Sequence, residues 1–316
     1  MKQSHSIFTT DIPILFIVFI RLDTTKRVLE RIREVKPKKL YIAGDGARKS
    51  KQGEFEKVQE LRDFILQSID WDCEIHTKFS EDNLGCKYNP QSAISWFFEH
   101  EEMGIILEDD CVPSNSFFRY CQELLQKHKN DLRIWGISGT NLLPNLEIPK
   151  SYYYSEFFMT WGWATWRDRW KTHLHMLENF EEYLDDPLVA KKLDNNLANE
   201  QIIHRARISY QDKLDAWDYQ WIFSCFANNA LLITPTKSLI QNIGFGEGAT
   251  HTGNSTGKQV KENEITFPLE HPKIIHANQA VDSIFFKTIF NMLTPFQKLT
   301  SINHIKKFIS ARLKTK

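Results

Sequence analysis

The sequence predicts an α/β fold in which a mostly parallel sheet is flanked by helices. In the first 140 residues, short apolar runs alternate with segments of helical periodicity, which is the pattern of strands buried on both faces. With 41% hydrophobic and 25% charged residues, the composition is that of an ordinary globular chain and excludes a disordered or collagenous protein. A length of 316 residues allows two domains or one enlarged α/β domain.

The strands and helices of the first half follow each other in regular order. Strands are expected over residues 12–20, 39–43, 71–76, 104–107 and 132–137, and helices over 24–35, 54–67, 90–99 and 116–127. The apolar run 12–20 is expected to be a buried strand and neither a signal peptide nor an anchor, because about 20 residues are needed to cross a bilayer and no cleavage site follows. Parallel sheets bind ligands where strand ends meet the following loops, so residues just after strands are the candidates for a site.

The second half is richer in aromatic residues. Helices are expected over 178–184, 198–210 and 216–227, and a strand pair over 231–233 and 238–241, followed by a glycine-rich loop at 244–248. We expect one domain over 1–282, with a nucleotide-sugar half (1–140) and an acceptor half (141–282). Residues 283–316 form a basic tail without acidic residues, whose apolar positions recur at helical spacing. This tail suits an amphipathic helix at an anionic membrane surface, and a terminal helix packed on the body is the alternative.

Charge and cysteine content limit the partners and the compartment. The 40 basic and 40 acidic residues give no net charge, which makes nucleic acid an unlikely partner. The five cysteines are an odd number without C-x-x-C spacing, which favours a reducing compartment and no zinc site. We expect a cytoplasmic protein, with peripheral association at the inner face of the cell membrane through the tail.

Three consecutive carboxylates, Glu108, Asp109 and Asp110, follow a buried strand. They repel one another and lose hydration there, so a positive group is expected beside them. A hard divalent cation, Mn²⁺ or Mg²⁺, suits such oxygen ligands and leaves room for phosphates. A solvated acidic turn or a helix cap is the alternative.

Several short motifs together carry a family resemblance. They are residues 16–25, 40–46, 83–86, 106–113, 161–166 and 217–221. With them the chain resembles GT-A-fold nucleotide-diphospho-sugar transferases, in particular a bacterial hemolytic-protein-like group, and it is similar to inverting N-acetylglucosaminyltransferases with a Glu-Asp-Asp motif. The resemblance implies a GT-A (Rossmann-like) fold and a role in polysaccharide biosynthesis. The chain departs from the pattern at Ile20-Arg21-Leu22, where Asn-Arg-Pro is expected.

The resemblance implies roles for the acidic motif and one histidine. Asp110 would be the direct metal ligand, Asp109 would reach the ribose or a metal-bound water, and Glu108 would support them. His251, after the glycine-rich loop, would complete the metal's shell, with a solvated loop histidine as the alternative.

The remaining donor contacts are implied in the same way. Arg21 would contact the diphosphate or ribose. Asp45 would accept the imide N–H of uracil, or would be part of a plain turn. Lys87 would neutralise phosphate or hold the base loop, or would be a surface lysine.

The acceptor is expected in the second half. Trp163, Trp217 and Trp221 offer faces on which a sugar can stack, although tryptophans at i, i+4 are equally suited to a core, and we expect at least one in each role. Asp218, flanked by tryptophans, is the expected catalytic base, and its place resembles that of the catalytic Asp in the Glu-Asp-Asp enzymes. Asp215 is the alternative base, and either carboxylate could instead mark a helix start.

These inferences converge on a metal-dependent, inverting glycosyltransferase of hexosyl type, which moves a sugar from a UDP-linked donor to a hydroxyl of a glycan or glycolipid. A sugar-nucleotide nucleotidyltransferase is one alternative, but no glycine-rich phosphate loop follows the first strand. A non-catalytic carbohydrate-binding protein is the other, and the presence of Asp110 and Asp218 argues against it.

Overall fold

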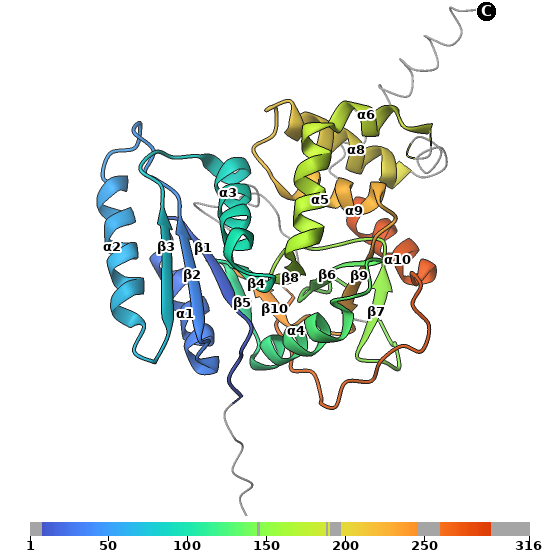
Figure 1. Cartoon of the computed structure of the whole chain (residues 1–316), viewed down its shortest axis with the longest axis horizontal. Coiled ribbons are helices and arrows are strands. Elements are labelled where there is room, and N and C mark those ends of the chain that lie inside the picture. Colours follow the sequence, from blue (N-terminus) through green and yellow to red (C-terminus); the bar gives the residue numbers. More distant parts are fainter. Residues whose placement is uncertain (1–7, 144–145, 188, 190–196, 246–259, 292–316) are drawn as a thin grey trace, which may run out of the picture. The chain divides into compact units, whose positions relative to one another are not determined.

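An eight-stranded sheet runs through the first of two structural units, which extends to Ala277 (Figure 1). The structure is a computed structural model that describes residues 8–143, 146–187, 189, 197–245 and 260–291. The strand order is β3-β2-β1-β4-β8-β6-β9-β7. The strands are β1 Ile14–Val18, β2 Lys39–Gly44, β3 Glu74–Phe79, β4 Met103–Glu108, β6 Ile134–Ser138, β7 Tyr152–Ser155, β8 Trp163–Trp166 and β9 Leu231–Pro235. A small second sheet pairs β5 (Cys111–Pro113) with β10 (Ile240–Asn242).

The pairing confirms the predicted α/β fold with a mostly parallel sheet. β1 pairs in parallel with β2 and β4, β2 with β3, and β6 with β9. β8 runs antiparallel between β4 and β6, and β7 runs antiparallel to β9. The predicted pairing of the strands near 231–233 and 238–241 is wrong, because β9 joins the large sheet whereas β10 joins β5.

Helices cover both faces of this sheet. In the first unit they are α1 Leu22–Val35, α2 Glu54–Ser68, α3 Gly85–His100, α4 Asn115–His128, α5 Arg167–Glu178, α6 Phe180–Asp185, α8 Leu197–Tyr210 and α9 Asp218–Ala227. Side chains alternate along β1, so that Phe16 packs with residues of α1, α2 and α4, whereas Leu15 packs with residues of α3, α5 and α9. Burial on both faces explains why the strands before the site are almost wholly apolar.

Most predicted boundaries differ from the structure by one or two residues, and those of α3 and β3 differ by more. Helix α3 begins at Gly85 and not at residue 90, so Pro90 lies within it. Strand β3 begins at Glu74, because the apolar residues Trp71 and Cys73 lie in the bend before it.

The second unit begins at Asn278 and contains helix α10 (Gln279–Asn291). The Asn278 side chain accepts a hydrogen bond from the amide of Val281 (3.3 Å), which caps the helix. The predicted domain boundary at 282 stays a prediction, and the amphipathic tail lies outside the described residues from 292 onward. None of the helices in the described ranges has the length and apolar character required to span a membrane.

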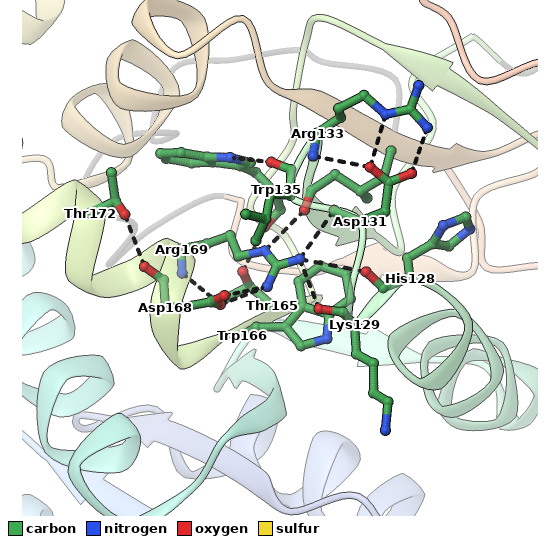
Figure 2. A network of polar contacts seen from close by, with 12 residues as sticks. His128, Lys129, Asp131, Arg133, Trp135, Thr165, Trp166, Asp168, Arg169 and Thr172 are labelled. Atoms are coloured by element: carbon green, nitrogen blue, oxygen red, sulfur yellow. Dashed lines mark hydrogen bonds and ion pairs between the residues drawn. The ribbon is translucent and has the colours of Figure 1, made fainter.

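Arg169 joins helix α4 to the sheet (Figure 2). Its side chain is 3% exposed, and the guanidinium donates to the carbonyls of Lys129 (3.1 Å) and Asp131 (3.1 Å), just after α4 ends. It also donates to the Asp168 carboxylate and stacks over the ring of Trp166. A cation at the carbonyl end of a helix is favourable, and here it also satisfies buried acceptors.

We predict that Arg169→Met lowers the free energy of unfolding by about 2–4 kcal/mol, because a buried side chain and its hydrogen bonds to carbonyls are lost together. Asp168→Asn is the matched control, since this carboxylate is 58% exposed and its ion pair should contribute under about 1 kcal/mol. Urea unfolding of both variants provides the measurement. Equal stability of the two variants would contradict the prediction.

Candidate active site

The acidic motif lies at the carboxyl end of β4, beside the end of β1. Glu108 is paired in register with Ile17, so the residues that follow Val18 run next to the motif. The strand before the motif is buried, Asp109 is 4% exposed, and Glu108 and Asp110 are half-buried. The three carboxylates therefore stand at the boundary between the core and the solvent, at the edge where parallel sheets bind ligands.

Arg21 compensates part of this negative charge. Its Nη2 donates to Asp109 and to Oδ2 of Asp110 (3.0 Å). The second oxygen of Asp109 accepts a hydrogen bond from the amide of Phe19 (3.3 Å). The expected contact of Arg21 with a diphosphate or ribose stays a prediction, and its ion pairs with the motif were not predicted. One guanidinium faces three carboxylates, and the motif retains negative charge.

The electrostatics of the motif reflect this imbalance. Burial raises the pKa of Glu108, the charges of Asp110 and Asp109 raise it further, and the charge of Asp218 adds to them. Burial also raises the pKa of Asp109, against the opposing effect of Arg21. Burial alone would lower the pKa of Arg21, but the charges of Asp109 and Asp110 outweigh it and raise that pKa. Added positive charge would stabilise the ionised form of all three acids.

The donors around Asp110 are of the kind that a divalent cation prefers, but the described residues do not by themselves form a complete metal site. Their donors are carboxylate oxygens, which hard cations prefer, and Arg21 already stands where a positive charge is favourable. Gly244 lies against the motif so closely that a Cβ there would overlap with Oδ2 of Asp110. Within the described ranges no three His, Cys, Asp or Glu side chains are grouped to hold a metal ion. His251, the second expected ligand, lies outside the described residues.

The strand pair β5–β10 positions Gly244 beside Asp110. Asn242 is opposite Cys111, and the amide of Ile243 donates to the carbonyl of Asp110 (2.8 Å). The Asn242 side chain then accepts a hydrogen bond from the amide of Gly244 (2.8 Å). The short second sheet therefore fixes the segment that leads into the glycine-rich loop beside the acidic motif.

Trp161 is an aromatic residue of the site that sequence reasoning did not select. It is half-buried and meets the ring of Phe245 edge to face, at 6.1 Å between ring centroids. Antiparallel pairing places Trp163 opposite Ile106, so Trp161, two residues earlier, precedes β8 on the side where β4 has its carboxyl end. Its place before an antiparallel strand could not be recognised without knowing that β8 pairs with β4.

The tryptophans that were predicted to bind the acceptor are buried. Trp163 and Trp221 are 0% exposed, and both pack with Trp170 in the aromatic core between the sheet and helices α5 and α9. Trp217 is stacked on Trp163, with 5.7 Å between ring centroids. The acceptor role is therefore corrected to a packing role for Trp163 and Trp221, because neither presents a face to a ligand. For Trp217 acceptor contact stays a prediction.

The structure corrects the role of Asp45 as well. Its two carboxylate oxygens accept four hydrogen bonds, from the amides of Gly46, Leu84 and Gly85 and from the side chain of Asn83, at 2.7–2.9 Å. A carboxylate has about four acceptor positions, so none remains for a uracil imide. Asp45 instead fastens the loop after β2 to the N-terminus of α3.

Lys87 is buried and is neither a surface lysine nor directed at a phosphate. Its ammonium donates to the carbonyl of Ser209 (2.7 Å) and to the carboxylate of Asp212 (2.6 Å). The positive charge of Lys87 therefore lies at the C-terminal end of helix α8. The predicted phosphate contact is therefore replaced by a contact that joins α3 to the second half of the chain.

Asp218 and Asp215 have different surroundings. Asp218 is the first residue of α9, is half-buried and lies close enough to Glu108 for its charge to raise the pKa of that carboxyl. Asp215 accepts hydrogen bonds from the amides of Cys86 (3.1 Å) and Lys87 (2.7 Å). Asp218 follows Trp217, whose partner Trp163 is paired with Ile106, two residues before Glu108. Of the two alternatives for the base, Asp218 is therefore the one on the side of the acidic motif, and its catalytic role stays a prediction.

Comparisons with known proteins found solved structures that are similar to parts of this chain. No family model and no curated protein matches the chain. HddC from Yersinia pseudotuberculosis is 8% identical, with 50% of this chain and 77% of that chain covered and a TM-score of 0.31. The mannosyltransferase PcManGT from Pyrobaculum calidifontis, solved with GDP-Man and Mn²⁺, is 10% identical, with 70% and 87% covered and a TM-score of 0.35. The galactosyltransferase LgtC, solved with donor and acceptor sugar analogs, is 12% identical, with 70% and 73% covered and a TM-score of 0.37. The proposed function rests on the residues of this chain.

We predict that Asp45→Ala lowers the free energy of unfolding by about 2–4 kcal/mol, because four donors lose their acceptor at once. Asp82→Ala is the control in the next loop, since its ion pair with Lys49 is exposed to solvent and should contribute little to stability. Urea unfolding tests both. If Asp45→Ala were as stable as the wild-type protein, the four hydrogen bonds would not be needed to hold the loop, and Asp45 would again be a candidate for binding the nucleotide base.

Proposed function

We propose that this chain is a metal-dependent, inverting glycosyltransferase of hexosyl type, with a nucleoside diphosphate sugar, most suitably UDP-linked, as the donor and a hydroxyl of a glycan or glycolipid as the acceptor. One observation carries the proposal. The acidic motif at the carboxyl end of β4 retains negative charge next to Arg21, and it is within electrostatic reach of a separate carboxylate, Asp218, at the start of α9.

The donor would be held at the acidic motif. Asp110 would ligate Mn²⁺ or Mg²⁺, together with donor phosphates and His251, and Asp109 would contact the ribose or a metal-bound water. A bound divalent cation neutralises the charge that develops on the departing diphosphate. Arg21, freed from part of its contact with the carboxylates, would donate to a phosphate oxygen.

Asp218 would act on the acceptor. It takes the proton of the acceptor hydroxyl while the hydroxyl oxygen forms a bond to the anomeric carbon and the bond from that carbon to the diphosphate breaks. Its charge is not committed to the cation, in contrast to that of Asp110. Trp161, half-buried and next to Phe245, would offer an aromatic face to one of the two sugars.

The first test is the variant Asp110→Asn. The wild-type protein should gain thermal stability from UDP or another nucleoside diphosphate only in the presence of Mn²⁺, since a ligand that binds the native state alone stabilises it by RT ln(1 + [L]/Kd). Asp110→Asn should lose this shift while keeping its unliganded melting temperature, because relief of repulsion in the motif offsets the lost contact with Arg21. Unchanged nucleotide affinity of the variant, measured by calorimetry with Mn²⁺, would refute the proposed metal site.

The second test concerns the base. Asp218→Asn should bind UDP and Mn²⁺ normally but lose about 10²- to 10⁴-fold in the rate of sugar transfer or donor hydrolysis, the usual contribution of a positioned base. Asp185→Asn is the control, because this exposed carboxylate of α6 lies in the same half of the chain. Near-normal turnover of the Asp218 variant would remove this residue from the mechanism.

A further inference from the structure

The N-terminus of α3 receives carboxylates from two distant parts of the chain. The amides of Leu84 and Gly85 donate to Asp45, and those of Cys86 and Lys87 donate to Asp215. The first amides of a helix have no partner within it, and here remote side chains supply that partner. Negative charge at this end of a helix is also favourable for the dipole.

Further contacts fasten the loop before α9 to the same turn of α3. Asp212 accepts hydrogen bonds from the ammonium of Lys87 (2.6 Å) and from the hydroxyl of Tyr88. One turn further along, the side chains of Gln91 and Gln220 are hydrogen-bonded to each other. α3 is thus attached to this segment at Asp212, before Asp215, and at Gln220 in α9, after Asp215.

Gly85 shows how closely Asp215 approaches the helix. A Cβ at Gly85 would lie 3.0 Å from Oδ2 of Asp215, and the φ of Gly85 is +79°, a conformation that favours glycine. Asp215 is itself exposed, and each of its oxygens accepts a backbone N–H. Its side chain is therefore directed at α3, whereas Asp218, three residues later, is on the side of the acidic motif.

We infer that Asp215 is a positioning residue that holds the start of α9 against α3 and so fixes the place of Asp218, the first residue of that helix. The inference rests on the proposed function for its kinetic consequence, and on the contacts of Asp215 for its structural one. A displacement of a catalytic group by about 1 Å can cost about 10²-fold in rate, so a remote cap can affect turnover without touching substrate.

The kinetic experiment uses donor hydrolysis with a UDP-sugar and Mn²⁺, in which water replaces the acceptor. Asp215→Ala should lower kcat about 10- to 100-fold and leave KM for the donor within about 2-fold. Asp215→Asn should recover part of the loss, because its amide oxygen can accept one of the two hydrogen bonds. The acid limb of the pH–rate profile should be unchanged in both variants, since the base is still Asp218.

Glu264→Ala is the matched control. Glu264 is another remote carboxylate that caps a helix, where it accepts hydrogen bonds from the amides of Asn115 (3.1 Å) and Ser116 (2.9 Å) at the start of α4. Glu264→Ala should lower the free energy of unfolding by about as much as Asp215→Ala does, and it should leave kcat unchanged. Normal kcat in Asp215→Ala would overturn the inference. So would loss of the acid limb in Asp215→Asn, because Asp215 would then be the base.

Hydrogen exchange gives a readout that needs no activity. In Asp215→Ala, the amides in the second turns of α3 (88–92) and of α9 (222–225) should both exchange faster, whereas Glu264→Ala should affect α4 alone. Faster exchange in α3 alone would overturn the positioning role, whether or not the protein transfers a sugar. Failure of UDP and Mn²⁺ to bind the wild-type protein would refute the proposed function and leave this result standing.

Discussion

Incomplete charge compensation at the end of β4 is the constraint on which the rest of the site depends. A fully buried strand leads into three carboxylates, and the hydrogen bonds of Arg21 reach only Asp109 and Asp110. Burial and mutual repulsion favour the protonated forms, so the ionised motif depends on the positive charge that surrounds it. The end of β1, the β5–β10 pair and Gly244 all meet at this point. Each of these elements places backbone or the Arg21 guanidinium beside the motif, and none of them adds another carboxylate.

The second constraint is mechanical and lies at the N-terminus of α3. Asp45 comes from the first half of the chain and Asp215 from the second half, and both accept backbone N–H groups of the same helix turn. The closeness of Asp215 contributes to the raised pKa of Asp45, after the effect of burial. The helix is thereby a shared support for both halves of the candidate site. Its position relates the residues that would hold the donor to those that would activate the acceptor.

The sequence allowed the parallel part of the fold and the acidic motif to be predicted, because strands buried on both faces are short apolar runs whose ends mark the ligand edge. It did not allow the start of α3 to be placed, since the caps lie 39 and 128 residues away along the chain, at Asp45 and Asp215. The assignment of Asp45 failed for the same reason: an acid after a strand can serve a ligand or a neighbouring backbone. Composition alone also could not separate Trp161 from Trp163, because Trp163 is covered as part of β8, whereas Trp161 lies before that strand begins.

The φ of +63° at Gly162 has a consequence for how this site can change. Along a regular strand, side chains two residues apart share a face, so Trp161 would be expected to join Trp163 in the core. The turn at Gly162 interrupts that regularity, and Trp161 remains partly exposed. Trp161 packs partly against the cluster that contains Leu107 and Ile240, whereas Trp163 belongs to the cluster of Trp170 and Trp221. Natural variation or engineering can therefore alter the partly exposed aromatic residue at position 161 while the tryptophan cluster around residue 163 keeps its composition.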